Sequence, residues 1–173
     1  AITHPGAVAH MVLRGIFLLR PSELYWMYQD GASHIFPDVW EQYLEPIPED
    51  ERDDLMAAYH RRLFSGNLPE ETKAARVWAN WENALASVQS ATTLGESPAD
   101  YARAFARLEN HYFVNAAFLE SDNWILQHKQ KIAHIPAVIV QGRYDMICPP
   151  ISAAKLAEGW TNASLQIIPM AGH

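Results

Sequence analysis

The sequence has very little cysteine, few basic side chains and no long apolar run. Its single cysteine, Cys148, excludes a disulfide within the chain and favours a reducing compartment, so we expect a cytoplasmic protein. The 13 lysines and arginines stand against 20 acidic residues, which gives a net charge of −7 and leaves no basic cluster for nucleic acid. No apolar run approaches the roughly 20 residues of a membrane helix, and the first residues show no signal-peptide pattern. We therefore expect neither a nucleic-acid nor a membrane partner.

Three short segments rich in Val, Ile and Leu, at residues 7–14, 135–140 and 164–168, predict strands. Near-continuous apolar runs of this kind suit parallel strands that are buried on both faces. Residues 152–160 between the second and third predict a crossover helix, and together they form one βαβ unit. The sequence thus predicts the α/β class.

The long middle of the chain has almost no strand signal and many helix-start signals, which predict five or six helices. We therefore expect a core strand segment at 1–20, an inserted all-helical cap at 21–131 and a core βαβ segment at 132–173. The helix tail that runs into Pro5, and the stop at His173 directly after a strand-like run, predict a chain that continues on both sides.

An acid and an imidazole follow two neighbouring strands. Asp145 comes directly after the second predicted strand, and His173 comes after the third. Because the carboxyl ends of parallel strands share one edge, these side chains are candidates for a catalytic pair in which the acid orients the imidazole. The order acid then histidine is that of α/β hydrolases. The alternative is that Asp145 only caps a turn and that His173 has no catalytic role.

Two glutamates lie on predicted inward helix faces. Glu82 shares a stripe with Trp78, Trp81 and Leu85, and Glu109 shares one with Phe105, Leu108 and Tyr112. An unpaired buried carboxylate is costly, so a cation should meet each of them. That cation could belong to an internal ion pair with Arg103, Arg107 or Arg143, or a polar contact with His111 could serve instead. The other interpretation is a bound substrate cation.

Several motifs spread over the whole chain resemble the prolyl aminopeptidases, also called proline iminopeptidases. They are MVLRGIF at 11–17, GAS at 31–33, FPD at 36–38, WEN at 81–83, ENHYF at 109–113, GRYD at 142–145 and AGH at 171–173. The resemblance implies an α/β-hydrolase core with a helical cap, represented here by about three parallel strands. It also implies a serine peptidase without metal or cofactor, which releases N-terminal proline from peptides.

The resemblance also assigns individual residues. It implies that Asp145 and His173 are catalytic, that Glu82 and Glu109 receive the substrate's protonated imino group, and that Phe17 lies near the proline ring. Cys148 matches a position near the active site, and it could equally be a small buried apolar residue. The family's nucleophile lies in a G-x-S-x-G elbow upstream of the first strand seen here, and none of the serines of this chain has that surrounding. We therefore expect a fragment that is inactive alone.

Two other classes of function stay open from the sequence. Another capped α/β hydrolase, such as an esterase or an epoxide hydrolase, would share the acid and the histidine but would have no reason to bury two cap glutamates. A non-catalytic binding module could keep the same fold. The sequence upstream would distinguish them, since a G-x-S-x-G elbow indicates a serine enzyme and an aspartate nucleophile indicates an epoxide hydrolase.

Overall fold

The computed structural model of this 173-residue chain describes residues 1–86, 88 and 97–173. Three parallel strands form one sheet in the order β1 (Met11–Arg14), β2 (Ala137–Gly142) and β3 (Ala163–Ile168). The register aligns Leu13 with Ile139 and Ile139 with Leu165. The expected three-stranded parallel sheet is thereby confirmed, with β2 in the middle and the other two strands at its edges.

The strand bounds differ from the expected ones for local reasons. Residues Pro5–Ala7 form a short 3₁₀ turn, so β1 begins only at Met11. At the other end of β2, Gln141 and Gly142 pair with Ile167 and Ile168 and so belong to the strand instead of following it. The crossover helix α7 (Pro150–Ala157) begins two residues earlier than expected because Pro150 can occupy a first helical position.

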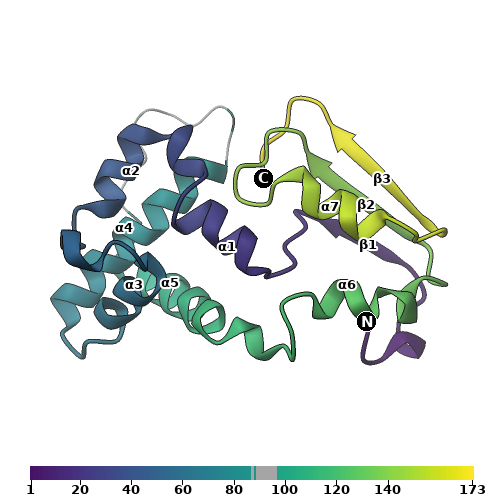
Figure 1. Ribbon diagram of the computed structural model, residues 1–173, viewed down its shortest axis with the longest axis horizontal. Coiled ribbons are helices and arrows are strands. Elements are labelled where there is room, and N and C mark those ends of the chain that lie inside the picture. Colours follow the sequence, from purple (N-terminus) through teal and green to yellow (C-terminus); the bar gives the residue numbers. More distant parts are fainter. Residues whose placement is uncertain (87, 89–96) are drawn as a thin grey trace.

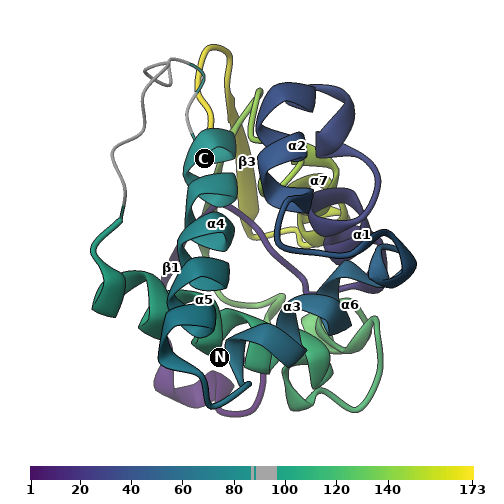
Figure 2. The same ribbon diagram turned by 90° about the vertical axis from the view of Figure 1, so that its left-hand side faces the viewer.

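Between the first and second strands, the described residues form six α-helices. These are α1 (Pro21–Tyr28), α2 (Pro37–Leu44), α3 (Leu55–Leu63), α4 (Leu68–Ala86), α5 (Ala99–Val114) and α6 (Trp124–His128). Helices α1, α2, α3, α4 and α5 form a helical body on one side of the sheet, seen on the left of Figure 1 and face-on in Figure 2. None of the described helices is long and apolar enough to cross a membrane.

Two separate apolar cores hold the molecule together. The first lies among the five helices α1, α2, α3, α4 and α5 and is dominated by aromatic rings in contact, among them Tyr28, Tyr43 and Trp78. The second lies between the sheet and α7 and includes Ile139 and Trp160. Side chains of α6 pack against this second core, so α6 lies with the sheet. The division of the chain at residues 20 and 131 stays a prediction about domains.

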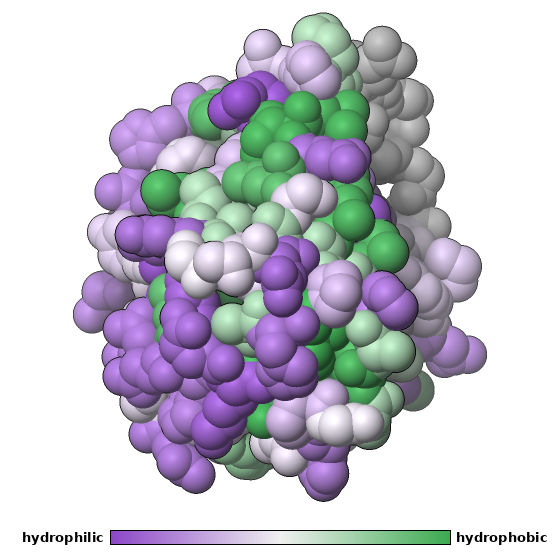
Figure 3. Space-filling view, turned by 90° about the vertical axis from the view of Figure 1, so that its right-hand side faces the viewer, coloured by the Kyte–Doolittle hydropathy of each residue, from purple (hydrophilic) through white to green (hydrophobic). Residues whose placement is uncertain are grey.

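Helix α7 covers one face of the sheet, and no helix of the described residues covers the other. Alternate strand residues on the open face, including Val12, Ser164 and Ile168, are exposed, and Val12 is 78% exposed. Figure 3 views the molecule from the β3 side, where apolar surface gathers beside polar surface. Parallel sheets are normally covered on both faces, so this face is a surface on which further protein could pack.

Candidate active site

The turn that follows β2 holds a buried carboxylate in a fixed position. Asp145 is 2% exposed, and its Oδ1 accepts hydrogen bonds from the backbone N–H groups of Ile147 at 3.1 Å and Cys148 at 2.7 Å. Its Oδ2 accepts from Nε2 of Gln141 at 2.8 Å. Three donors that point at one carboxyl group leave it little freedom to rotate.

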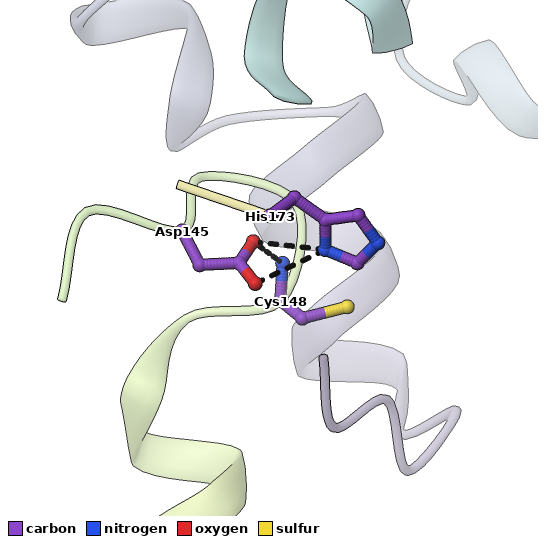
Figure 4. A group of neighbouring side chains, drawn as sticks. All are labelled: Asp145, Cys148 and His173. Atoms are coloured by element: carbon purple, nitrogen blue, oxygen red, sulfur yellow. Dashed lines mark hydrogen bonds and ion pairs between the residues drawn. The ribbon is translucent and has the colours of Figure 1, made fainter. Parts of the chain in front are cut away.

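His173 completes this group from the end of β3. Its Nδ1 lies 3.0 Å from Oδ2 and 3.2 Å from Oδ1 of Asp145 (Figure 4). Its backbone N–H donates to the carbonyl of Ala86 at the end of α4, at 2.9 Å, which ties it to the helical body. With a proton on Nδ1 facing the acid, Nε2 is left as the acceptor that a general base needs. The geometry is that of an orienting acid and a base.

Two glycines make this approach possible. A Cβ atom on Gly15, whose φ is +58°, would lie 2.8 Å from Cε1 of His173. A Cβ atom on Gly142 would lie 2.0 Å from the carbonyl oxygen of Gly172. Real Cβ atoms do not come this close, so any larger residue at either position would displace the segment that carries the histidine.

One cavity of about 400 Å³ is lined by all the site residues predicted from the sequence except Asp145, which is buried. Its lining includes Phe17 after β1, Glu82 from α4, Glu109 from α5, and Cys148 and His173 from the carboxyl edge of the sheet. Asp145 lies directly behind His173. The predicted substrate-binding and catalytic side chains, which are up to 156 positions apart in the sequence (173 − 17), thus meet in one place.

Sequence reasoning missed two residues that act on the glutamates. The hydroxyl of Tyr28 on α1 donates to Oε1 of Glu82, and Nε1 of Trp78 donates to Oε2 of Glu109 at 3.0 Å. Trp78 was expected only as a core residue, and it is fully buried. Nothing in the local sequence of α1 signals that Tyr28 reaches α4, since the two partners are 54 positions apart.

Burial and mutual electrostatic repulsion act on the pKa values of Glu82 and Glu109. Burial, and then the charge of Glu109, raise the pKa of Glu82 well above its usual value, and burial also raises the pKa of Glu109. Neither carboxylate forms an ion pair with another described residue. The site therefore holds carboxyl groups that lack a cation and would gain from one.

The arginines that offered the alternative ion pairs lie elsewhere. Arg103 and Arg107 both contact Oε2 of Glu71 at 2.7 Å, and Arg143 is exposed. His111 contacts the rings of Tyr112 and Phe118. The internal ion pair considered for Glu82 and Glu109 is thus not observed among the described residues.

The stripe that was expected around Glu109 is only partly correct. Phe105 and Glu109 line the cavity, but Leu108 is 62% exposed and Tyr112 is 45% exposed. The row of α5 that faces inward follows an i, i+4 spacing through Phe105, Glu109 and Phe113 instead. The stripe around Glu82 is confirmed, since all three of its apolar partners are buried.

Phe17 and Cys148 form part of the apolar wall of the cavity. The ring of Phe17 meets that of Phe113 edge-on, with 5.7 Å between centroids.

Burial, and then the charge of Asp145, raise the pKa of the Cys148 thiol above its usual range. A buried thiol whose pKa is raised is mostly protonated near neutral pH, which disfavours a role as a nucleophile. Ligand atoms of Asp145, Cys148 and His173 lie within 4.8 Å of one another, and both carboxylate oxygens of Asp145 already accept hydrogen bonds from N–H groups.

Comparisons with known proteins agree with this geometry. The chain is 50% identical over 173 residues to a probable proline iminopeptidase of Leptolyngbya boryana, covering 99% of this chain and 54% of that protein. It is 51% identical over 172 residues to a proline iminopeptidase of Xanthomonas citri, with coverage of 98% and 55%, and 47% identical over 174 residues to one of Arabidopsis thaliana, with coverage of 99% and 46%. The chain spans about half the length of these curated relatives.

A family model for the alpha/beta hydrolase fold matches residues 1–173, the whole chain. The parallel sheet, the crossover helix and the position of Asp145 and His173 at the carboxyl ends of neighbouring strands are the features of that fold. The chain therefore belongs to the α/β-hydrolase fold family.

Proposed function

We propose that this chain supplies the helical cap and the acid–histidine pair of a serine aminopeptidase that releases N-terminal proline from peptides. The observation that carries the proposal is the pair of carboxyl groups, Glu82 and Glu109, that face one cavity with His173 and have no ion-pair partner among the described residues. Relatives named proline iminopeptidase, about 50% identical over nearly all of this chain, support the same activity. The single cysteine favours the cytoplasm as its compartment.

In this proposal the substrate enters the cavity with its free N-terminus first. The protonated imino nitrogen lies between Glu82 and Glu109, where a cation relieves the repulsion between two carboxylates. The proline ring packs against the apolar wall formed by Phe17 and Phe113. The scissile carbonyl then lies toward His173, and a peptide without a free protonated N-terminus would leave the carboxylates unpaired.

His173 serves as the general base. Its Nε2 takes the proton of a serine hydroxyl as that oxygen attacks the carbonyl, and later gives the proton to the leaving amine. Asp145 holds the imidazole in the required tautomer and stabilises its charged form. Cys148 takes no part in proton transfer and contributes apolar surface only.

The nucleophile is proposed to come from protein outside these residues. No serine is among the described residues that line the cavity, and the sequence holds no G-x-S-x-G elbow. Relatives that are about twice as long have room for such an elbow and for the donors that stabilise the oxyanion. The 173 residues alone should therefore read at background with proline β-naphthylamide. Turnover that persists after chelation and repurification would contradict this.

The function is tested with a matched pair of substrates on the full-length protein. Proline β-naphthylamide carries a protonated imino group, and N-acetylproline β-naphthylamide is its uncharged counterpart. We expect hydrolysis of the first and almost none of the second, unchanged by EDTA. Hydrolysis of both at similar rates would contradict recognition of a cation and would favour an unspecific capped hydrolase.

A further inference from the structure

A buried amide lies directly behind the catalytic acid, and the proposed mechanism does not use it. Gln141, near the carboxyl end of β2, is 1% exposed. Strand alternation places it on the same face of the sheet as Ile139 and Ala137, which belong to the apolar core against α7. A polar side chain in such a place is retained only where all its hydrogen-bonding groups find partners.

The amide of Gln141 uses both of its donors and its oxygen. Its Nε2 donates to Oδ2 of Asp145 at 2.8 Å and to the backbone carbonyl of Cys148 at 2.9 Å. Its Oε1 accepts from the backbone N–H of Ile16 at 3.0 Å. A half-turn of the amide would set its oxygen against two acceptors and its NH₂ group against an N–H. The three partners therefore fix its orientation.

The three partners belong to different parts of the site. Asp145 is the acid that faces His173, and the carbonyl of Cys148 closes the turn whose N–H groups hold the other carboxylate oxygen. Ile16 lies between Gly15, against which the ring of His173 rests, and Phe17, which forms the cavity wall. One side chain thus connects the acid, its turn and the segment that contacts both histidine and substrate pocket.

We propose that Gln141 is a positioning residue that fixes the Asp145 carboxylate and the 15–17 segment relative to one another. Through these hydrogen bonds the imidazole of His173 and the ring of Phe17 share one rigid support. Proton transfer and binding of the proline ring then take place in a single geometry. The proposal rests on the proposed peptidase function and adds to it a residue that does not contact the substrate.

The test compares two substitutions that remove amides of the same kind in the full-length protein. Gln141→Met keeps the approximate length of the side chain and removes all three hydrogen bonds. Gln29→Met is the matched control, because Gln29 also joins two backbone segments, donating to the carbonyl of Arg52 at 2.8 Å and accepting from the N–H of Leu55 at 3.1 Å. Neither partner of Gln29 touches the catalytic pair.

We expect both variants to lose stability, but only Gln141→Met should change catalysis. Its kcat should fall about 10- to 100-fold, by analogy with residues that orient metal ligands through a hydrogen bond, whose replacement causes losses in this range. The acid limb of its pH–rate profile should also move to higher pH, because an Asp145 carboxylate that has lost a donor holds the proton on His173 more strongly. The other titratable groups that line the cavity are the same in both variants: Tyr28, Glu82, Tyr101, Glu109 and Cys148.

A second variant covers the case in which Gln141→Met does not fold. Gln141→Glu keeps the shape and the acceptor for Ile16, but it sets an oxygen toward Asp145. Its acid limb should move in the same direction, and further. Equal losses of kcat in Gln141→Met and Gln29→Met, with unmoved pH–rate profiles, would show that Gln141 contributes only to stability and would overturn the proposal.

A separate measurement keeps this proposal apart from the proposed function. If the wild-type protein releases no proline, the peptidase assignment fails, whatever Gln141 does. Titration of the His173 imidazole by NMR in the same proteins needs no substrate. A titration that moves to higher pH in the Gln141 variants, and not in Gln29→Met, supports the positioning role. Unmoved titrations in all of them reject it.

Discussion

The ring of His173 rests directly on the backbone of Gly15, so that a Cβ atom there would lie 2.8 Å from its Cε1. Gly15 also has a φ of +58°, which other residues rarely adopt. The backbone just after β1 therefore supports the imidazole ring. The position of His173 depends on the absence of a side chain at Gly15.

Gly15→Ala should lower kcat more than its loss of stability explains. A displaced imidazole costs up to about 100-fold in rate for a shift of about 1 Å. Gly66→Ala is the matched control, because Gly66 has a φ of +79° and nothing within 4 Å of its added Cβ atom. Both variants should lose about 1 kcal/mol of stability from backbone strain, measured by urea unfolding. Equal kcat values for the two would show that His173 tolerates the contact.

The proposed catalytic pair, Asp145 and His173, gives the most direct test of the proposed mechanism. Asp145→Asn should leave substrate binding nearly intact and lower kcat by about 10⁴-fold, the loss that the same change causes in Ser-His-Asp proteases, because the amide holds the imidazole in the wrong tautomer. His173→Ala should be at least as severe. Asp38→Asn, an exposed carboxyl on α2, is the control and should keep its kcat. Retention of most activity by Asp145→Asn would mean that another acid orients the histidine.

Much of the fold follows from the spacing of apolar residues. The strands were predictable because apolar runs bounded by Gly or Pro leave few other structures, and the burial of Glu82 was predictable because Trp78, Trp81 and Leu85 mark its helix face. The same reasoning placed Leu108 inward, and it is exposed, because the face that α5 presents to its neighbours is chosen by tertiary packing.

The parts of the site that the sequence did not predict depend on long-range contacts. The hydrogen bond from Tyr28 to Glu82 spans 54 positions, and the one from Ile16 to Gln141 spans 125. The second apolar run predicts a strand that ends at residue 140, so Gln141 was not predicted as a strand residue. Periodicity indicates which face is buried, but it does not name the polar partner that is found there.

The glutamates should also make stability depend on pH. The pKa of Glu82 is raised in the folded protein, so at pH above about 4.5 the folded state holds a proton that the unfolded state has lost. Stability therefore falls as pH rises from there toward the raised value. Glu82→Gln replaces the titrating carboxyl by an amide that does not titrate. The amide keeps an oxygen that accepts from Tyr28, and its NH₂ group can donate to Glu109. The variant should therefore be more stable than wild type near neutral pH.

This is checked by urea unfolding of the full-length protein at about pH 5 and about pH 8. The difference in unfolding free energy between the two values should be smaller in Glu82→Gln than in wild type. Glu45→Gln, whose side chain is 66% exposed, should behave like wild type. A Glu82→Gln protein that is less stable than wild type at both values would show that the carboxylate is satisfied in the folded state.

The proposed recognition of a cation predicts a loss that depends on the substrate. Glu82→Gln or Glu109→Gln should each lower kcat/KM for proline β-naphthylamide. The fall should correspond to a loss of about 2–5 kcal/mol in transition-state binding free energy, the range for removing one partner of a desolvated charge pair. Hydrolysis of p-nitrophenyl acetate should fall much less, since this uncharged ester brings no cation to the carboxylates. Glu41→Gln, on the exposed surface of α2, is the control and should change neither rate. Because the stability of Glu82→Gln is expected to rise, a loss confined to the proline substrate cannot come from unfolding. Equal losses on both substrates would instead give these glutamates a role in shaping the cavity and would remove the main support for a prolyl aminopeptidase.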